Sequence, residues 1–523
     1  MSGRKKIKKN VGPATIHLLI IGVILILQIA GAIILAGFLQ GNVWWVTLLW
    51  YVVAFFAGFY VNFHHDNPST KFFWILLIFL FPAFGLLIYT VWGLPHRSKK
   101  KQTLLKKSAE AARSALFLYS ERQSTPMSFD PNPVEDAFPS IRNVSHYLEN
   151  MGFPAFSRTR IQYLPSGERL FDDCLENLEK AEKSIFLSFF ILKQGELWDR
   201  FYPLLAEKVK SGVEVRLLLD DAGTMFNISR DFIRNLRDCG IQVSIFNPTH
   251  RYLNTLYLNY RNHQKFIIID SNIGYTGGVN LADEYANYTS PFGYWKDTGV
   301  RLEGEGVFGM TTIFLSMWEQ TNQTLLDEFD GYLPTVSVES PGFCHVFSDG
   351  PANNPENPAE GVIFRLIESA REYIYLTTPY LVTSQAMIDT LCRVARSGVR
   401  VVILVPFQLD HWYVFEVTQS QFPVLIDAGV EIYRYSPGML HAKMIVSDDS
   451  EALVSTINLD NRSFYSQYED GVWFCGSDAV SDVKRDIEEA LSVSRRVTRE
   501  DCDSLHVLRR FLGVLLRLFA PLM

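Results

Sequence analysis

The chain has 523 residues, of which 48% are hydrophobic and 14% aromatic. This length exceeds one ordinary domain, and the apolar content is high enough to suggest a membrane part. The net charge is -7, but the first 107 residues are strongly basic and the remainder is strongly acidic. An acidic main body repels a phosphate backbone, so the composition argues against a nucleic-acid enzyme and predicts no nucleic-acid partner.

Three apolar runs open the chain, at residues 18–38, 43–61 and 72–92. Each has about the 20 residues that a helix needs to cross a bilayer, so residues 1–93 predict a membrane anchor of two or three transmembrane helices. Basic clusters flank both ends of this region, and the preference of such clusters for the cytoplasm conflicts with three full crossings. The third run is the candidate for a re-entrant bend, because Pro82 and Gly85 interrupt its centre.

Residues 94–145 predict a connector. A short Ala-rich helix near residues 109–118 is followed by a stretch rich in Pro, Ser, Asp and Asn that lacks apolar periodicity. From Val144 onward, short β-branched runs alternate with amphipathic helical segments, which is typical of an α/β domain.

Similar segments recur in the same order in the two halves of this α/β body. The strand-like segments at 184–189 and 211–219 (SIFLSF, SGVEVRLLL) match those at 373–377 and 397–405 (YIYLT, SGVRVVILV). The body is therefore predicted to be a duplication, with one α/β domain at residues 146–333 and a second at 334–500. An amphipathic helix is predicted for residues 501–523.

Each half then carries the same motif, H-x-K-x-x-x-x-D. The first copy consists of His263, Lys265 and Asp270, and the second of His441, Lys443 and Asp448. Residues i and i+2 of a strand share a face, so each His should lie beside its Lys, whereas each Asp falls on the other face or past the strand end and suits a supporting role. Further residues follow at similar positions in both copies, namely Asn280 and Asn458, then Asp297 and Glu469.

Two imidazoles and two ammonium groups suit phosphoryl-type transfer. One imidazole can attack phosphorus while the second protonates the leaving alkoxide, and the lysines neutralise phosphate oxygens. Asn280 and Asn458 can donate hydrogen bonds to those oxygens, and Asp297 or Glu469 can hold each imidazole in its useful tautomer. A single such triplet is more often an ordinary set of surface or core residues. Two triplets at equivalent places of a duplicated body favour a functional role, because charged residues on half-buried strands cost free energy unless they serve a function. Metal binding by the two histidines is a weaker alternative, because paired carboxylate or Cys spacing is missing.

These residues resemble the two HKD motifs of the phospholipase D superfamily, and most of the chain is similar to its bacterial cardiolipin synthases. The likeness includes GGVNLADEY, GYWKDT, NLDNRSF and the closing RFLGVLLRLFAPLM. It implies two duplicated phospholipase D-like domains forming one active site at their interface. It also implies transfer of a phosphatidyl group between two phosphatidylglycerol molecules through a phosphohistidine, with release of glycerol. His263 would be the nucleophile and His441 the general acid/base, without a metal or organic cofactor.

The same resemblance implies a multi-pass protein of the bacterial cell membrane that meets phosphatidylglycerol and other anionic lipid. The sequence departs from the family at Gln264, where Arg is frequent, and at Ser455, where Gly is common. A hydrolytic phospholipase D, or a phosphatidyltransferase that uses another alcohol, remains the alternative, and a non-enzymatic lipid-binding scaffold fits two intact motifs less well. The sequence does not predict the oligomeric state.

The C-terminal segment carries one further pattern. One helical stripe contains His506, Arg509, Arg510, Gly513 and Arg517, and apolar residues fill the rest. A basic stripe on an apolar helix suits an anionic membrane surface. The alternative is a helix docked on its own domain with its arginines at the surface.

Overall fold

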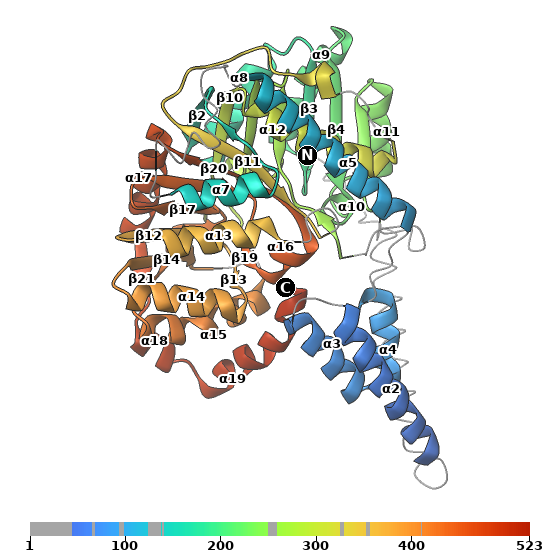
Figure 1. Ribbon diagram of the computed structural model, residues 1–523, viewed down its shortest axis with the longest axis vertical. Helices are drawn as coiled ribbons and strands as arrows, with labels where there is room; N and C mark the ends of the chain where they lie inside the picture. Colours follow the sequence, from blue (N-terminus) through green and yellow to red (C-terminus); the bar gives the residue numbers. More distant parts are fainter. Residues whose placement is uncertain are drawn as a thin grey trace, which may run out of the picture. The chain divides into compact units, whose positions relative to one another are not determined.

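The computed structural model describes residues 44–64, 68–93, 99–123, 138, 141–248, 259–324, 329–351, 356–408 and 411–523. The chain divides into two units, Met1–Pro95 and His96–Met523, which are described separately. Figure 1 shows the helices and strands with the labels used below.

The first unit contains α2 (Trp44–His64), α3 (Pro68–Leu80), α4 (Pro82–Ile88) and the π-helical turn η1 (Tyr89–Gly93). Its small core is built from Ala54, Val61, Phe73, Trp74, Ile78 and Tyr89. α3 and α4 meet closely at Gly85, where an added Cβ would lie 2.5 Å from the carbonyl oxygen of Leu77.

The predicted transmembrane helices are not found in the part of the chain that the structure describes, where no helix is long and apolar enough to cross a membrane. The run at 72–92 is divided at Phe81, because a residue that precedes proline is driven out of the helical conformation. The resulting helices have 13 and 7 residues, each shorter than the ~20 that a crossing needs. The run at 43–61 forms most of α2. The run at 18–38 lies outside the described residues.

The second unit contains a seven-stranded sheet in its first half. The strand order is β2 (Thr159–Leu164), β10 (Gly299–Gly304), β8 (Ile273–Gly277), β7 (Phe266–Ile269), β3 (Ser184–Phe189), β4 (Glu214–Asp220) and β5 (Gln242–Phe246). One face packs against α8 (Gly167–Leu178), α9 (Glu196–Lys210) and α11 (Arg230–Asp238), and the other against α12 (Val307–Asn322). Shorter helices are α10 (Asp221–Thr224), η2 (Asp283–Ala286) and η3 (Phe329–Tyr332).

The second half builds a larger sheet. Its main path is β1 (Ala155–Phe156), β11 (Phe343–Asp349), β20 (Gln467–Cys475), β18 (Glu451–Ser455), β17 (Met444–Ser447), β12 (Tyr373–Thr377), β14 (Arg400–Pro406), β15 (Glu431–Tyr435) and β21 (Ser494–Arg496). The helices α7 (Arg142–Asn150), α13 (Pro358–Ser369), α14 (Gln385–Arg396) and α15 (Trp412–Asp427) cover one face, and α17 (Asp478–Ser492) covers the other. The chain continues through α16 (Asn461–Ser466) before β20, and through α18 (Arg499–Asp503), α19 (Val507–Leu516) and η4 (Arg517–Leu522) at its end.

The two sheets repeat one topology. β3 pairs in parallel with β4, which pairs in parallel with β5, while β3 pairs antiparallel with β7. β12, β14, β15 and β17 repeat this arrangement. The repeated segments of the sequence therefore occupy equivalent places in two α/β domains.

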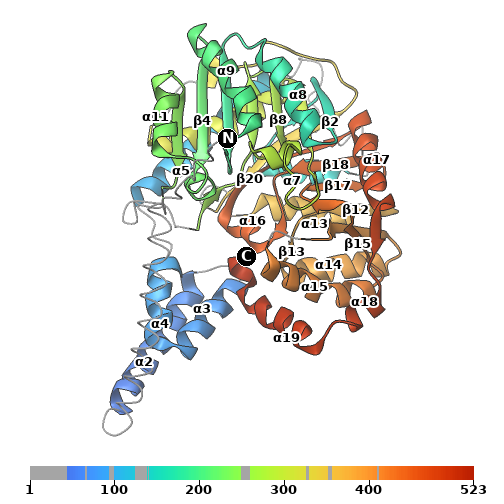
Figure 2. The ribbon, with the colours of Figure 1, turned by 180° about the vertical axis from the view of Figure 1, so that it is seen from behind.

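Segments before the first sheet depart from the predicted order. The helix expected near residues 109–118 is longer, α5 (Lys99–Gln123), and it buries Ala112, Leu116 and Tyr119 in the core beside α12. α7 packs in the core of the second sheet and β1 pairs with β11, although both precede the first sheet in the sequence. This exchange ties the two halves together, and Figure 1 shows α7 next to α13 of the second half, with the reverse view in Figure 2.

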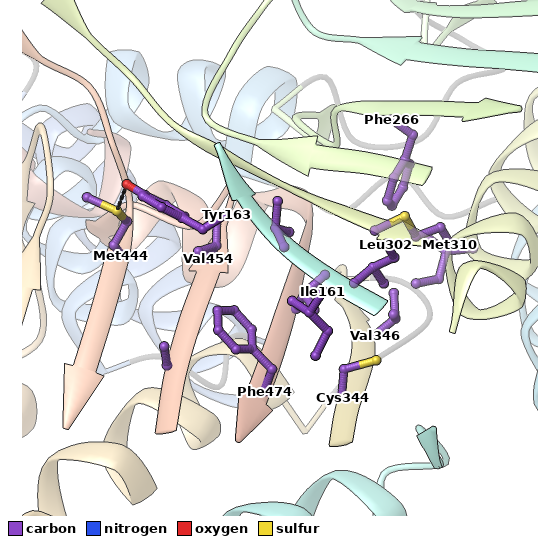
Figure 3. Close-up of a cluster of buried hydrophobic side chains, with 14 of the residues drawn as sticks. Ile161, Tyr163, Phe266, Leu302, Met310, Cys344, Val346, Met444, Val454 and Phe474 are labelled. Atoms are coloured by element: carbon purple, nitrogen blue, oxygen red, sulfur yellow. Dashed lines mark hydrogen bonds between the residues drawn. The ribbon is translucent and has the colours of Figure 1, made fainter. Parts of the chain in front are cut away.

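One hydrophobic cluster is shared by the two domains, and each domain also has a core of its own. Figure 3 shows Ile161 and Tyr163 of β2 between side chains of the two sheets, with Phe266 on one side and Phe474 on the other. The Tyr163 hydroxyl lies 2.9 Å from Met444 Sδ and donates to Asp486 at 2.6 Å. A shared apolar cluster of this kind holds the two domains against each other.

Candidate active site

Each motif histidine follows a short strand that crosses to the other domain. β6 (Arg261–Asn262) pairs in parallel with the start of β20, and β16 (Gly438–Leu440) pairs in parallel with β9 (Tyr294–Lys296). The backbone N–H of His263 donates to Tyr468 O at 2.9 Å, and that of His441 donates to Lys296 O at 2.7 Å. Each histidine therefore lies beside the residue that comes next on the other domain's strand, which is Glu469 or Asp297.

The imidazoles are held by these acids in an exchanged arrangement. His263 Nδ1 lies 2.9 Å from Glu469 Oε2, and His441 Nδ1 lies 2.7 Å from Asp297 Oδ2. Both histidines are only 6% exposed and both carboxylates are fully buried. A carboxylate on Nδ1 fixes the ring and leaves Nε2 for chemistry. The sequence left open which acid serves which histidine, and the structure pairs each one across the domain interface.

The two lysines lie beside the histidines as predicted, although the prediction placed both pairs on strands. Lys265 Nζ donates to His263 O at 2.6 Å, and Lys443 Nζ lies 2.9 Å from His441 Nδ1 and 3.0 Å from its Nε2. These residues occupy the three-residue segments before β7 and β17 rather than the strands themselves. Burial lowers the pKa of Lys265 to about 8 and that of Lys443 to about 7.

Burial and neighbouring positive charges also lower the pKa of both imidazoles. The pKa of His263 is well below its usual value because of burial and the charges of Lys265 and Lys443. The pKa of His441 is lowered by burial and Lys443, while Asp297 opposes the decrease. His263 is therefore held neutral, and His441 has the stronger support for a proton.

The pKa values of the two acids that hold the imidazoles are shifted in opposite directions. Burial raises the pKa of Glu469 to about 7, although its carboxylate also accepts a hydrogen bond from Thr456 Oγ1 at 2.5 Å. Burial alone would raise the pKa of Asp297, but His441 and Lys443 together hold it below its usual value. At the place where the second copy has Thr456, the first has Gly278, and a Cβ there would lie 2.0 Å from Asp297 Oδ1.

The two predicted asparagines are buried but have different surroundings. Asn280 Oδ1 accepts from the Ile191 N–H at 3.0 Å, and its Nδ2 donates to the Tyr285 hydroxyl at 2.8 Å. Its amide is therefore engaged in holding the chain beyond β3. Asn458 Oδ1 is buried and forms no hydrogen bond with the described residues. The expected role of both amides toward a phosphate group stays a prediction.

The motif aspartates lie away from the imidazoles. Asp270 accepts three backbone N–H groups, from Glu182, Lys183 and Ser184, at 2.7–2.8 Å. Asp448 accepts the equivalent set from Arg371, Glu372 and Tyr373 at 2.7–2.9 Å. Each Asp also adopts a positive φ at the end of its strand. These contacts fix the starts of β3 and β12, so the structure gives the two aspartates a supporting position and not a place with the catalytic groups.

Sequence reasoning missed several residues of this site. Asp470 Oδ1 accepts from the Lys265 N–H at 3.2 Å, and its other oxygen accepts from the Thr276 hydroxyl. Thr456 and Gly278 contact the catalytic acids, as described above. The adjacent acidic pair in the segment YED was the one available signal, because an acid next to a candidate acid in a buried strand needs a partner. Among the described residues, no three His, Cys, Asp or Glu side chains are grouped so as to hold a metal ion.

The repeated α/β fold and the paired His–Lys site define a phospholipase D-like protein. A family model described as "Cardiolipin synthase, PLD-like domain" matches residues 174–290 and 363–491. A cardiolipin synthase of Oceanobacillus iheyensis is 33% identical over 466 residues, which cover 87% of this chain and 94% of that protein. The chain belongs to the cardiolipin synthase family.

Other relatives agree with this assignment. A cardiolipin synthase of Alkalihalophilus pseudofirmus is 30% identical and covers 95% of this chain and 98% of its own length. An uncharacterized protein of Streptococcus mutans is 38% identical over 86% of this chain and 96% of that protein. Among solved structures, phosphatidylserine synthase of Haemophilus influenzae has a TM-score of 0.56 at 16% identity, covering 73% of this chain and 97% of that chain. This structural likeness bears on the fold alone.

Proposed function

We propose that the protein is a cardiolipin synthase that transfers the phosphatidyl group of one phosphatidylglycerol to a hydroxyl of a second and releases glycerol. The observation that carries the proposal is the site itself. Two buried imidazoles, each held by a carboxylate of the other domain, lie among two buried ammonium groups. Such a set supplies a nucleophile, a proton donor and positive charge for a phosphodiester.

In the first step, Nε2 of His263 attacks phosphorus and the bond from phosphorus to the glycerol oxygen breaks. The leaving alkoxide takes a proton from His441, so glycerol departs neutral and a phosphatidyl–histidine remains. The low pKa of His263 supports its role as nucleophile, because a neutral imidazole is needed. Ionised Asp297 supports His441 as the proton donor.

In the second step, neutral His441 accepts a proton from the hydroxyl of a second phosphatidylglycerol. The resulting alkoxide attacks phosphorus, and the bond from phosphorus to His263 breaks, which restores the free enzyme. Lys265 and Lys443 offset the negative charge that the phosphoryl oxygens carry in both transition states. The substrates are lipids, so we also propose that the enzyme works at the bacterial cell membrane.

Purified enzyme in phosphatidylglycerol vesicles tests the proposal when lipids and free glycerol are quantified over time. Cardiolipin and glycerol should rise in equal amounts in the wild type, and neither should rise with His263→Ala. Phosphatidic acid without cardiolipin would make water the acceptor and refute the transferase. A new phospholipid that forms only when serine or ethanolamine is added would identify another acceptor alcohol.

A further inference from the structure

The C-terminal helix α19 exposes an apolar face. Val507, Leu508 and Phe511 are 66%, 71% and 62% exposed, and Val514 is 56% exposed. Leu515 extends the same exposed set. An apolar group of this size on the surface of a folded protein marks an interaction site, because water contact costs about 25 cal/mol per Å2 of apolar surface.

Two of the arginines in the predicted basic stripe contact α15. Arg509 forms an ion pair with Glu416 at 2.7 Å, and Arg517 donates to Gln421. Gly513 also lies against this helix, where an added Cβ would be 2.8 Å from Glu416 O. α19 is therefore docked on its own domain by this stripe and by Leu516, which packs against the cluster of Val382, Val414 and Val417. Other apolar side chains of α19 stay exposed. The docking agrees with the second reading of the sequence, except that two of the arginines contact α15.

The C-terminus is also connected to the active site. The Arg462 N–H donates to the carbonyl oxygen of Met523 at 3.0 Å, and Asn461 Nδ2 donates to Ala520 O at 3.4 Å. Asn461 and Arg462 open α16, which leads directly into β20 and Glu469. The charge of Arg462 is among the causes that lower the pKa of His263. The exposed helix is thus placed by the same segment that carries a catalytic acid.

We propose that the face formed by Val507, Leu508, Phe511, Val514 and Leu515, here called the α19 face, docks on the surface of an anionic bilayer and brings the active site to its lipid substrate. The positive charge of the segment favours an anionic surface over a neutral one. Residues 505–523 contain three arginines and no acid. Arg510 is exposed on α19, with its guanidinium 4.0 Å from the Asp503 carboxylate. Apolar side chains enter the acyl boundary while adjacent cations meet anionic head groups. The proposal rests on the proposed function for the identity of the lipid substrate.

A fluorescent probe on the α19 face of the full chain tests the docking independently of activity. Leu508→Cys carries an environment-sensitive label in a Cys239→Ser background, because the other five cysteines are buried. Glu207→Cys on α9 is the matched control, since it is exposed and Figures 1 and 2 draw α9 and α19 at opposite ends of this unit. The labelled proteins are added to phosphatidylglycerol vesicles that contain lipids with a nitroxide on the acyl chain.

The probe at position 508 should shift to shorter wavelength on adding vesicles and lose about half of its emission to the nitroxide lipid, whereas the probe at 207 should keep its emission. Equal quenching at both positions, or quenching at neither, would overturn the proposal. A probe at 508 that is already blue-shifted in detergent and stays unquenched in vesicles would mean that protein covers the face, which also overturns it.

Activity provides a second measurement. The double variant Leu508→Ser/Phe511→Ser should raise the KM for phosphatidylglycerol in vesicles about tenfold or more, because it removes two membrane-inserting side chains. The KM for a short-chain phosphatidylglycerol below its micelle concentration should be unchanged. Equal losses on both substrates would refute a docking role. If no cardiolipin forms at all, the quenching result still stands, so failure of the docking proposal and failure of the synthase proposal are distinguishable.

Discussion

The two halves of the active site have the same plan but not the same electrostatics. In the first half, His263 is held by Glu469. Burial raises the pKa of Glu469 to about 7, and its carboxylate accepts a hydrogen bond from the Thr456 hydroxyl. In the second, His441 is held by Asp297, an acid whose pKa stays low beside a glycine. The comparison teaches that a duplicated motif can divide the roles of nucleophile and proton donor through the neighbours of each histidine, while the motif itself stays unchanged.

The largest effect should come from the histidines. His263→Ala should lower kcat about 10⁴-fold or more because no covalent intermediate can form. His441→Ala should lower it about 10²–10⁴-fold, because only proton transfer is lost. A phosphatidyl ester with a nitrophenol leaving group needs no proton donor for the first step. It should therefore label the His441→Ala enzyme covalently and leave His263→Ala unlabelled, and the opposite labelling would exchange the two roles.

Replacing Asp297 or Glu469 by its amide should show that the two acids differ in protonation state. Asp297→Asn should cost roughly 10²–10³-fold in kcat/KM at every pH from 6 to 8, because Asp297 is ionised throughout that range. Glu469→Gln should cost little at pH 6, where the carboxyl is protonated, and more at pH 8, where it is charged. Kinetics of both variants across this range check the point. Parallel pH profiles for the two variants would contradict the proposed difference between the protonation states of the two acids.

The side chains beside the acids should have smaller effects. Gly278→Ala should lower kcat about 30-fold, because its Cβ must displace the Asp297 carboxylate. Thr456→Val removes one hydrogen bond to Glu469 and should cost about fivefold. Steady-state rates of the two variants, with circular dichroism to show that each folds, measure the contrast. A larger loss in Thr456→Val than in Gly278→Ala would contradict it.

The kcat/KM of the wild type should depend on pH through the protonation of Lys265 and Lys443. Lys443 and Lys265 have pKa values of about 7 and about 8, and a lysine carries its charge only below its pKa. As pH rises through these values the ammonium groups lose their protons, so kcat/KM should fall about tenfold between pH 7 and 9. Initial rates on monomeric short-chain lipid give the profile without a change in vesicle charge. A profile that stays flat to pH 9 would show that the lysines remain charged.

The motif aspartates should matter least to catalysis. Asp270→Asn leaves the imidazoles untouched but weakens three backbone hydrogen bonds to a carboxylate. It should lower the free energy of unfolding by about 2 kcal/mol and change kcat less than about twofold. Denaturant unfolding and kinetics on the same preparation measure both, with Asp448→Asn as the matched variant of the other half. A loss of activity without a loss of stability would return these residues to the catalytic set.

Much of the site could be read from the sequence because the motif repeats. His263, Lys265, His441 and Lys443 are paired as their spacing predicts, and Asp297 and Glu469 are the acids that hold the imidazoles. Thr456 and Asp470 could not be predicted from spacing, because their contacts depend on which strands become neighbours. The N-terminal prediction of transmembrane helices was wrong for the described residues, since hydropathy summed over a run ignores the break that Pro82 imposes.

The duplicated α/β architecture and the paired His and Lys residues could be inferred from the sequence alone, because repeated patterns are local properties of the chain. The tertiary structure alone decided three further features. It paired each histidine with the acid of the other domain, gave the two acids opposite pKa shifts, and left apolar side chains of α19 exposed. Each of these depends on which distant segments meet and how deeply they are buried. A linear pattern does not contain that information, because burial and long-range pairing arise only when the chain has folded.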